Sequence, residues 1–215
     1  MKIAKLLDAI MGLITAYKAG LVKRRVKKPK NVAICVGHSR IGDRGADSIS
    51  GVTEWEYNKK VADILQAQLR HQGITSVVFD EYPADSYGGA MNWLARAIRK
   101  EECDIAIELH FNSFANENAA GYEYLYYTGS KNGERLANCF LKAHGDSFTA
   151  QTSRGVKSTD TVQRGAAFLR RVPPPAVICE PFFGSSPKDW AAFEFKGLLL
   201  AGAYTQAIVE YFKDE

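Results

Sequence analysis

The chain has 215 residues, of which 46% are hydrophobic and 24% charged. It is therefore long enough for one domain with a proper core or for two small ones, and its composition excludes a disordered protein. The net charge of +4 is unevenly placed, because residues 1–30 hold nine Lys and Arg side chains against the single acid Asp8. The remainder is slightly acidic, which argues against an enzyme that acts on nucleic acid.

An amphipathic helix followed by a basic linker is predicted for residues 1–30. Apolar side chains recur there at helical spacing, at Ile3, Leu6, Leu7, Ile10, Leu13 and Ile14, and the run KRRVKKPK follows. Because Lys5, Asp8 and Lys18 interrupt the apolar stretch, it indicates neither a membrane-spanning helix nor a clear cleavable signal peptide. Two interpretations remain open: the helix packs on its own domain or on a second copy, or it contacts anionic envelope material.

From Asn31 onward, apolar strand-like runs alternate with helical patterns. Strands are predicted near residues 31–36, 75–79, 104–109, 122–127 and 176–179, and helices near 54–71, 89–101, 132–144 and 190–212. This alternation predicts a single α/β domain over residues 31–215, with a largely parallel twisted sheet flanked by helices. Residues 145–172 lack clear periodicity, so we expect a long surface loop there, with room for one short helix.

The four cysteines indicate separate thiols rather than disulfides or a metal knuckle. Cys35 and Cys179 lie in apolar strand-like runs, Cys103 precedes another such run, and Cys139 falls in a helical pattern. The chain contains no CxxC pair. This usage is consistent with synthesis in a reducing compartment.

Three predicted strands end in residues that could perform chemistry. VAICVGH ends in His38, CDIAIELH ends in His110, and PPAVICE ends in Glu180. In open α/β sheets, ligands bind outside the carboxyl ends of the strands. Two imidazoles and a carboxylate around an open position are the usual composition of a hydrolytic zinc site. A single histidine at a strand end is usually just hydrogen-bonded, but three such endings together favour a metal site.

The other two histidines are predicted to be structural. His71 and His144 each fall in the last turn of a predicted helix and are closely followed by a glycine. A histidine at that position can satisfy free carbonyl groups, and glycine supplies the left-handed cap.

The carboxylate that completes the metal shell must be chosen between Glu54 and Glu56. Thr53 and Glu56 match the S/T-x-x-E capping box, which gives Glu56 a structural role at the start of the helix. Glu54 occupies the first helical position without such a role. We therefore predict that Glu54 is the ligand and that Glu180 is left for catalysis.

The pattern of these residues resembles the zinc-dependent N-acetylmuramoyl-L-alanine amidases of the Amidase_3 family, found among bacterial cell-wall enzymes and phage endolysins. That family opens with a strand, a Gly-His pair and then Asp-x-Gly-Ala, matched here by Gly37, His38 and DRGA at 43–46. The following helix carries Glu-x-x-x-Asn, matched by Glu54 and Asn58.

The second half of the chain also resembles the family. His110 and Asn112 match its His-x-Asn, and Glu180, after the Pro175-Ala176 pair, matches its catalytic glutamate. SRGVKS at 153–158 is similar to its Arg-Gly-Val-Lys stretch, and the resemblance runs from Val32 to about Phe212.

Two departures from the family's pattern bear on substrate detail. EPFFGSS replaces the usual Gly-Phe pair after the glutamate, and Glu108 replaces a small hydroxyl residue. Strand alternation puts Glu108 on the face of His110, either as its partner or as a buried acid without a metal role.

The resemblance implies one zinc ion bound by His38, Glu54 and His110, with Glu180 as general base. It also implies that peptidoglycan is the substrate, cleaved at the amide between N-acetylmuramic acid and L-alanine of the stem peptide. Such an enzyme acts on the cell wall, in the periplasm or outside the cell. The lack of a clear signal peptide favours a phage-type lysin released by a partner, or a non-standard export route.

Two other functions are compatible with the residues. One is a different zinc amide hydrolase, such as a carboxypeptidase-like enzyme, in which Arg154 or Arg164 would hold the substrate's free carboxylate. The other is a wall-binding module with an inactive metal site. An intact Glu180 argues against the second, because an inactive site has no need of a general base.

Overall fold

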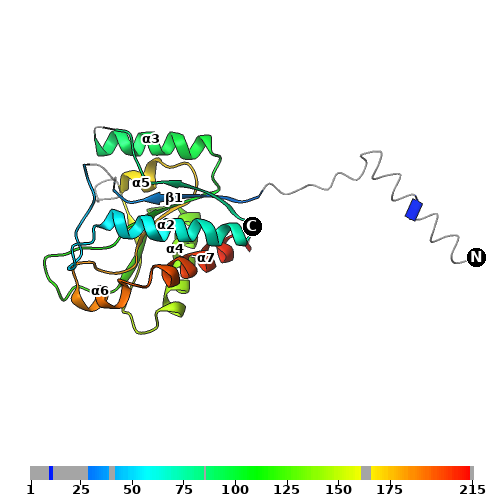
Figure 1. The fold of residues 1–215 in the computed structure, drawn as a ribbon. Helices are drawn as coiled ribbons and strands as arrows, with labels where there is room; N and C mark the ends of the chain where they lie inside the picture. The colour runs from blue at the N-terminus through cyan, green and yellow to red at the C-terminus, as the bar shows by residue number, and fades with distance from the viewer. Residues whose placement is uncertain (1–9, 12–28, 39–41, 85, 161–165, 214–215) are drawn as a thin grey trace, which may run out of the picture.

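The computed structural model describes residues 10–11, 29–38, 42–84, 86–160 and 166–213 (Figure 1). The strands are β1 Asn31–Val36, β2 Thr75–Phe79, β3 Ile105–Leu109, β4 Tyr122–Tyr127, β5 Ser153–Thr159 and β6 Ala176–Glu180. The helices are α2 Glu54–His71, α3 Tyr87–Lys100, α4 Lys131–Ser147, α5 Ala166–Arg171, α6 Pro187–Phe193 and α7 Gly197–Lys213. The predicted N-terminal helix and linker lie outside the described residues, apart from a helical Ile10 and Met11 and the last two linker residues.

One six-stranded sheet, in the order β2-β1-β3-β6-β4-β5, forms the centre of the domain. Strands β2, β1, β3 and β6 run parallel to one another, and β4 is antiparallel to β6 but parallel to β5. The predicted α/β domain with a largely parallel sheet is thus confirmed. Because of these strand directions, the carboxyl ends of β1, β3 and β6 and the amino ends of β4 and β5 lie at the same edge of the sheet.

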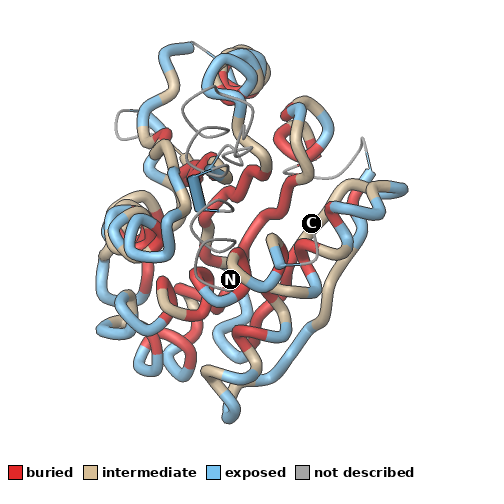
Figure 2. Tube along the Cα trace, turned by 90° about the vertical axis from the view of Figure 1, so that its right-hand side faces the viewer, coloured by how far each residue is buried: buried red, intermediate tan, exposed pale blue. Residues whose placement is uncertain are grey.

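Helices cover both faces of this sheet. Helices α2, α4 and α7 pack on one face, and α3 and α5 pack on the other (Figure 1). The central strands β1, β3 and β6 are buried, whereas the helices have exposed outer sides (Figure 2). Burial on both faces explains why β1 and β3 consist of nearly uninterrupted apolar residues. None of the helices within the described ranges is long and apolar enough to cross a bilayer.

The structure corrects two of the predicted elements. The expected loop at 145–172 contains the end of α4, strand β5 and the short helix α5. The single helix expected at 190–212 is two helices, because the chain turns after Phe193. The Phe193 side chain is buried, and its carbonyl oxygen accepts a hydrogen bond from the Tyr57 hydroxyl at 2.9 Å. The four cysteines are free thiols, as predicted.

Both remaining histidines are structural, but His144 is not a cap. His71 ends α2, and Gly73 beyond it has a φ of +72°, which is the predicted left-handed termination. Helix α4 continues past His144 to Ser147, and the His144 ring is fully buried against Tyr122, at 4.0 Å between ring centroids. Its Nδ1 lies 2.7 Å from the Tyr124 hydroxyl and its Nε2 lies 2.5 Å from Oε1 of Gln151.

We expect His144 to make the stability of the domain depend on pH. Burial lowers the pKa of His144 to about 4, although its hydrogen bond with Gln151 acts in the opposite direction. An unfolded histidine binds a proton near pH 6.5, so between pH 6.5 and 4 the unfolded chain binds more protons than the folded one. The free energy of unfolding therefore decreases as the pH is lowered through this range. The contribution is fully present above pH 6.5 and amounts to about 3 kcal/mol, lost on acidification.

Urea unfolding at pH 7 and pH 5 measures this contribution. The native protein should lose about 2 kcal/mol more between these two pH values than His144→Gln, which cannot titrate but can still form a hydrogen bond. Equal losses in the two proteins would show that the ring is not kept neutral by the fold.

Candidate active site

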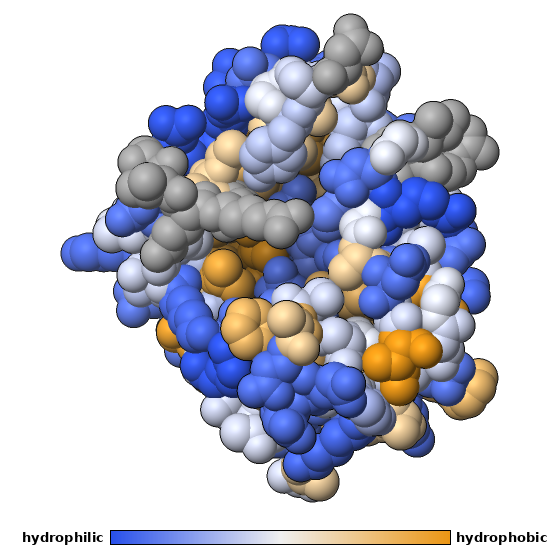
Figure 3. All heavy atoms as spheres, turned by 90° about the vertical axis from the view of Figure 1, so that its left-hand side faces the viewer, coloured by the Kyte–Doolittle hydropathy of each residue, from blue (hydrophilic) through white to orange (hydrophobic). Residues whose placement is uncertain are grey.

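A cavity of about 750 Å³ opens at the edge of the sheet where the carboxyl ends of β1, β3 and β6 meet. Figure 3 looks onto this side of the molecule, where the surface is hollowed beside the residues drawn in grey. The cavity is lined by all the site residues predicted from the sequence, His38, Glu54, His110 and Glu180. The chain therefore brings together residues that are up to 142 positions apart.

His38 and His110 follow β1 and β3, two strands that are paired side by side. The glycine before His38 is required by close packing, because a Cβ at Gly37 would lie 2.3 Å from the His110 ring. His38 itself has a φ of 66°, an uncommon conformation for a residue other than glycine. The two ring centroids lie 5.2 Å apart in an edge-on arrangement.

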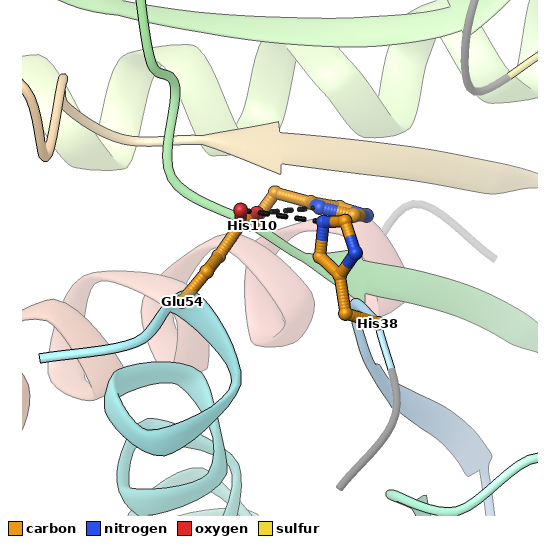
Figure 4. A group of neighbouring side chains, drawn as sticks. All are labelled: His38, Glu54 and His110. Atoms are coloured by element: carbon orange, nitrogen blue, oxygen red, sulfur yellow. Dashed lines mark hydrogen bonds and ion pairs between the residues drawn. The ribbon is translucent and has the colours of Figure 1, made fainter. Parts of the chain in front are cut away.

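Glu54 reaches both imidazoles from the start of α2 (Figure 4). Its Oε1 lies 2.7 Å from His110 Nδ1 and its Oε2 lies 3.3 Å from His38 Nε2. Backbone amides hold the same carboxylate, since Phe111 N–H donates to Oε1 and Ala46 N–H donates to Oε2. Burial opposes ionisation of Glu54, but its hydrogen bonds with His110 and His38 lower its pKa to about 2. The site thus contains a buried, ionised carboxylate between two imidazoles.

Glu56 forms the predicted capping box. Thr53 Oγ1 accepts a hydrogen bond from the Glu56 amide, and the Glu56 carboxylate accepts one from the Thr53 amide. Glu56 also pairs with Arg44 at 2.7 Å and turns away from the histidines. The structural role that the sequence assigns to Glu56 is confirmed.

Each histidine has a second carboxylate on its other ring nitrogen. Asp43 Oδ1 lies 3.0 Å from His38 Nδ1, and Glu108 Oε2 lies 3.3 Å from His110 Nε2. Glu108 is buried and, as strand alternation predicts, lies on the face of His110. Carboxylate partners of this kind fix the orientation and tautomer of an imidazole that binds a metal through its remaining nitrogen.

His38, Glu54 and His110 could hold a metal ion. One ligand atom from each residue can be chosen so that all lie within 4.8 Å of one another. The space beside them is restricted at Gly45, which has a φ of +77° and where a Cβ would lie 2.6 Å from His38 and 2.7 Å from Glu54. Two nitrogen donors and one carboxylate facing a cavity form a donor set that suits a divalent cation with an open coordination position.

Glu180 is the last residue of β6, which pairs with β3, and it lines the same cavity. It makes no hydrogen bond to His38, Glu54 or His110. Its Oε2 is buried and has no hydrogen-bond partner among the described residues. Burial raises the pKa of Glu180 to about 8; the charge of His110 lowers it, and the carboxylates of Glu54, Glu123 and Glu108 raise it further. A carboxyl group with a raised pKa is suited to exchanging protons.

Sequence reasoning missed a polar cluster beside Glu180. Glu123 of β4 is paired in register with Glu180, and its carboxylate binds Arg154 and Lys157 of β5. Glu123 and Arg154 are the second residues of their strands and Lys157 lies within β5, so a search of the carboxyl ends of strands passes over all three. The signal present in the sequence was SRGVKS, in which Arg154 and Lys157 are three residues apart. Arg164, also considered as a carboxylate-binding residue, lies outside the described residues.

The fold and the site define an α/β protein with a His-Glu-His group and a nearby free carboxyl group at the carboxyl edge of its sheet, an arrangement typical of metal-dependent hydrolases. The chain belongs to the family described as N-acetylmuramoyl-L-alanine amidase, Amidase_3, whose model matches residues 32–210. No curated protein matches the sequence.

Solved structures of such amidases share the fold. The CwlD amidase of Clostridioides difficile, solved in complex with the GerS lipoprotein, is 18% identical with a TM-score of 0.77, and the match covers 86% of this chain and 100% of that one. AmiC2 of Nostoc punctiforme is 20% identical with a TM-score of 0.72, covering 86% and 97%. The catalytic domain of the CD27L endolysin, which targets Clostridia difficile, is 24% identical with a TM-score of 0.71, covering 84% and 97%.

Proposed function

We propose that this chain is a zinc-dependent peptidoglycan amidase that hydrolyses the amide bond between N-acetylmuramic acid and L-alanine of the stem peptide. The observation that carries the proposal is the grouping of His38, Glu54 and His110 at the cavity that Glu180 also lines. Family membership supports the choice of bond. We propose His38, Glu54 and His110 as the ligands of one zinc ion, and Glu180 as the catalytic residue.

Each residue of the site has a separate role in the proposed hydrolysis. When bound, zinc supplies a Lewis acid that makes water a stronger nucleophile and polarises the scissile carbonyl. Asp43 and Glu108 hold the two imidazoles so that His38 Nε2 and His110 Nδ1 face Glu54. Glu180 takes the proton of the attacking water and passes it to the leaving nitrogen of L-alanine. A cation held beside Glu180 would lower its pKa and favour its ionised form, and its unpartnered Oε2 would then be available to accept that proton.

Mass spectrometry of digested peptidoglycan tests the proposed function. Purified wall material treated with the protein should release stem peptides that begin with an unmodified alanine, and a chelator should stop their release until zinc is restored. Peptides shortened at the carboxyl end, with the muramoyl link intact, would instead indicate a carboxypeptidase. No change to the wall would indicate a binding module.

We infer that the protein acts in the periplasm or outside the cell, where peptidoglycan lies. A phage lysin is one kind of protein that acts there. We also propose that residues 31–215 form the catalytic domain, because every site residue lies after Val32. Residues 1–30 would then serve contact with the anionic envelope through their basic side chains.

Removing residues 1–29 tests this division of the chain. We expect the shortened protein to fold and to cleave soluble muropeptides at the native rate, because the site residues are retained. Its binding to anionic envelope fractions should weaken, and the difference from the full chain should shrink in high salt, as screening requires. A folded but inactive shortened protein would place part of the site within the first 29 residues.

A further inference from the structure

The polar cluster beside Glu180 carries more positive than negative charge. Glu123 Oε2 accepts hydrogen bonds from Arg154 Nε at 2.6 Å and from Lys157 Nζ at 2.5 Å, and Glu123 Oε1 accepts one from Asn112 Nδ2 at 3.2 Å. We call Glu123, Arg154 and Lys157 the Glu123 cluster. One carboxylate and two cations leave a surplus of one positive charge. Glu123 lines the cavity, so the two cations bound to its carboxylate lie directly behind this part of the cavity wall.

An irregularity in β5 puts both cations on the same side of the sheet. Tyr122 pairs with Ser153 but Tyr124 pairs with Val156, so β5 contains one extra residue at this point. Gly155, within the extra step, has a φ of +82°, which glycine adopts without strain. In a regular strand, residues 154 and 157 would point to opposite faces, whereas a bulge re-aims a side chain. Here both reach Glu123.

Arg154 is held in place with part of its hydrogen-bonding capacity unused. Its Nε is bound to Glu123 and its guanidinium lies over the Phe183 ring, 5.0 Å from the centroid. Within the described part of the chain, its two Nη groups make no hydrogen bond, and 37% of the side chain is exposed. A pre-oriented guanidinium on a partly exposed side chain, with both Nη groups free of hydrogen bonds to described residues, is suited to binding a carboxylate.

The cluster also lies close to the proposed point of cleavage. Glu123 and Glu180 are directly opposite residues of an antiparallel pair, so their side chains share one face and their Cβ atoms are roughly 5 Å apart. Any group bound by Arg154 is therefore a short distance from the bond that Glu180 serves. In the proposed substrate, the acid of N-acetylmuramic acid is consumed in the scissile amide and alanine is neutral. The first anionic group is the α-carboxylate of the glutamate that follows alanine.

We propose that Arg154, assisted by Lys157, binds this carboxylate and makes the protein select stem peptides with a free α-carboxyl over those in which it is amidated. The inference rests on the proposed function and names a specificity residue for it. The amidated peptide presents an NH₂ group to the guanidinium, which has no acceptor to offer it. A site built to pair with a charged group discriminates strongly against an analogue that lacks it.

Two soluble muropeptides that differ in one group test the proposal. They are N-acetylmuramoyl-L-alanyl-γ-D-glutamyl-L-lysine and the same compound with the glutamyl α-carboxyl converted to carboxamide. For the native protein, kcat/KM should be about 10-fold or more higher for the acid. Arg154→Gln should lower kcat/KM for the acid by about 10-fold more than for the amide, so that the two compounds are cleaved at nearly equal kcat/KM. Arg70→Gln, at the far end of α2, is the matched control and should keep the native preference.

Other outcomes overturn the inference in distinguishable ways. Equal cleavage of both compounds by the native protein, or an equal loss for both in Arg154→Gln, would mean that Arg154 only supports Glu123. Cleavage of neither compound would reject the proposed function, and the inference with it. If Arg154→Gln does not fold, Arg154→Lys keeps the charge without the two-pronged donor and should reduce the preference several-fold. An unchanged preference in that variant would also overturn the inference.

Discussion

Glu180→Gln is expected to leave zinc and fold in place while turnover falls by roughly 100-fold or more, the usual scale of general-base catalysis. Glutamine has nearly the shape of glutamate and can form hydrogen bonds, but it cannot accept the proton of the attacking water. Because Glu180 makes no hydrogen bond to His38, Glu54 or His110, the change should not disturb the metal site.

Turnover of a soluble muropeptide, zinc content and thermal unfolding of the same preparation decide the result. Glu210→Gln is a suitable control, since Glu210 lies on the exposed side of α7 and pairs with Lys213. That control should keep native turnover. If zinc is lost together with activity in Glu180→Gln, Glu180 is a ligand rather than the base. If Glu180→Gln stays active, the group at the strand ends is not the catalytic site.

The sequence predicts the central strands and misses β5 for one physical reason. Strands β1 and β3 are buried on both faces, so their apolar runs stand out against the helical patterns around them. Strand β5 lies at the edge of the sheet, is mostly polar and contains the irregularity at Gly155. That irregularity removes the period-2 alternation by which a half-buried strand is recognised. The same feature concealed that Arg154, named from the sequence only as a residue for a free carboxylate, and Lys157 both reach Glu123.

The direction of β4 had a similar effect on the site. A run such as YEYLYY predicts a strand but not whether it lies parallel or antiparallel to its neighbour. Because β4 and β5 run against β6, their beginnings lie at the edge where the other strands end. Glu123 therefore lies beside Glu180 although the rule about carboxyl ends points elsewhere. By contrast, the choice between Glu54 and Glu56 depended on a local rule, the capping box, and the structure places Glu54 between the two imidazoles.

The choice of Glu54 over Glu56 as the metal ligand gives a second prediction with a large effect. Glu54→Ala is expected to remove zinc, whereas Glu56→Ala is expected to keep it. Three protein ligands are the usual complement of a catalytic zinc site, and the loss of one leaves only His38 and His110. Glu56 faces Thr53 and Arg44 instead, so its removal should only weaken the start of α2, at a cost of about 1 kcal/mol. The two glutamates are two residues apart on one helix, which makes each variant the control for the other.

Zinc content after dialysis, measured beside the urea unfolding of each variant, separates the two roles. Glu54→Gln should be included, since it keeps the side-chain volume and an oxygen that can accept from the Ala46 or Phe111 amide, but removes the charge that lies between the imidazoles. We expect zinc to be lost from Glu54→Ala and Glu54→Gln alike, and to remain stoichiometric in Glu56→Ala. The reverse pattern would make Glu56 the ligand. Zinc retained in all three variants would mean that the ion binds elsewhere, because a buried carboxylate that both imidazoles face could not be removed from a real metal shell without effect.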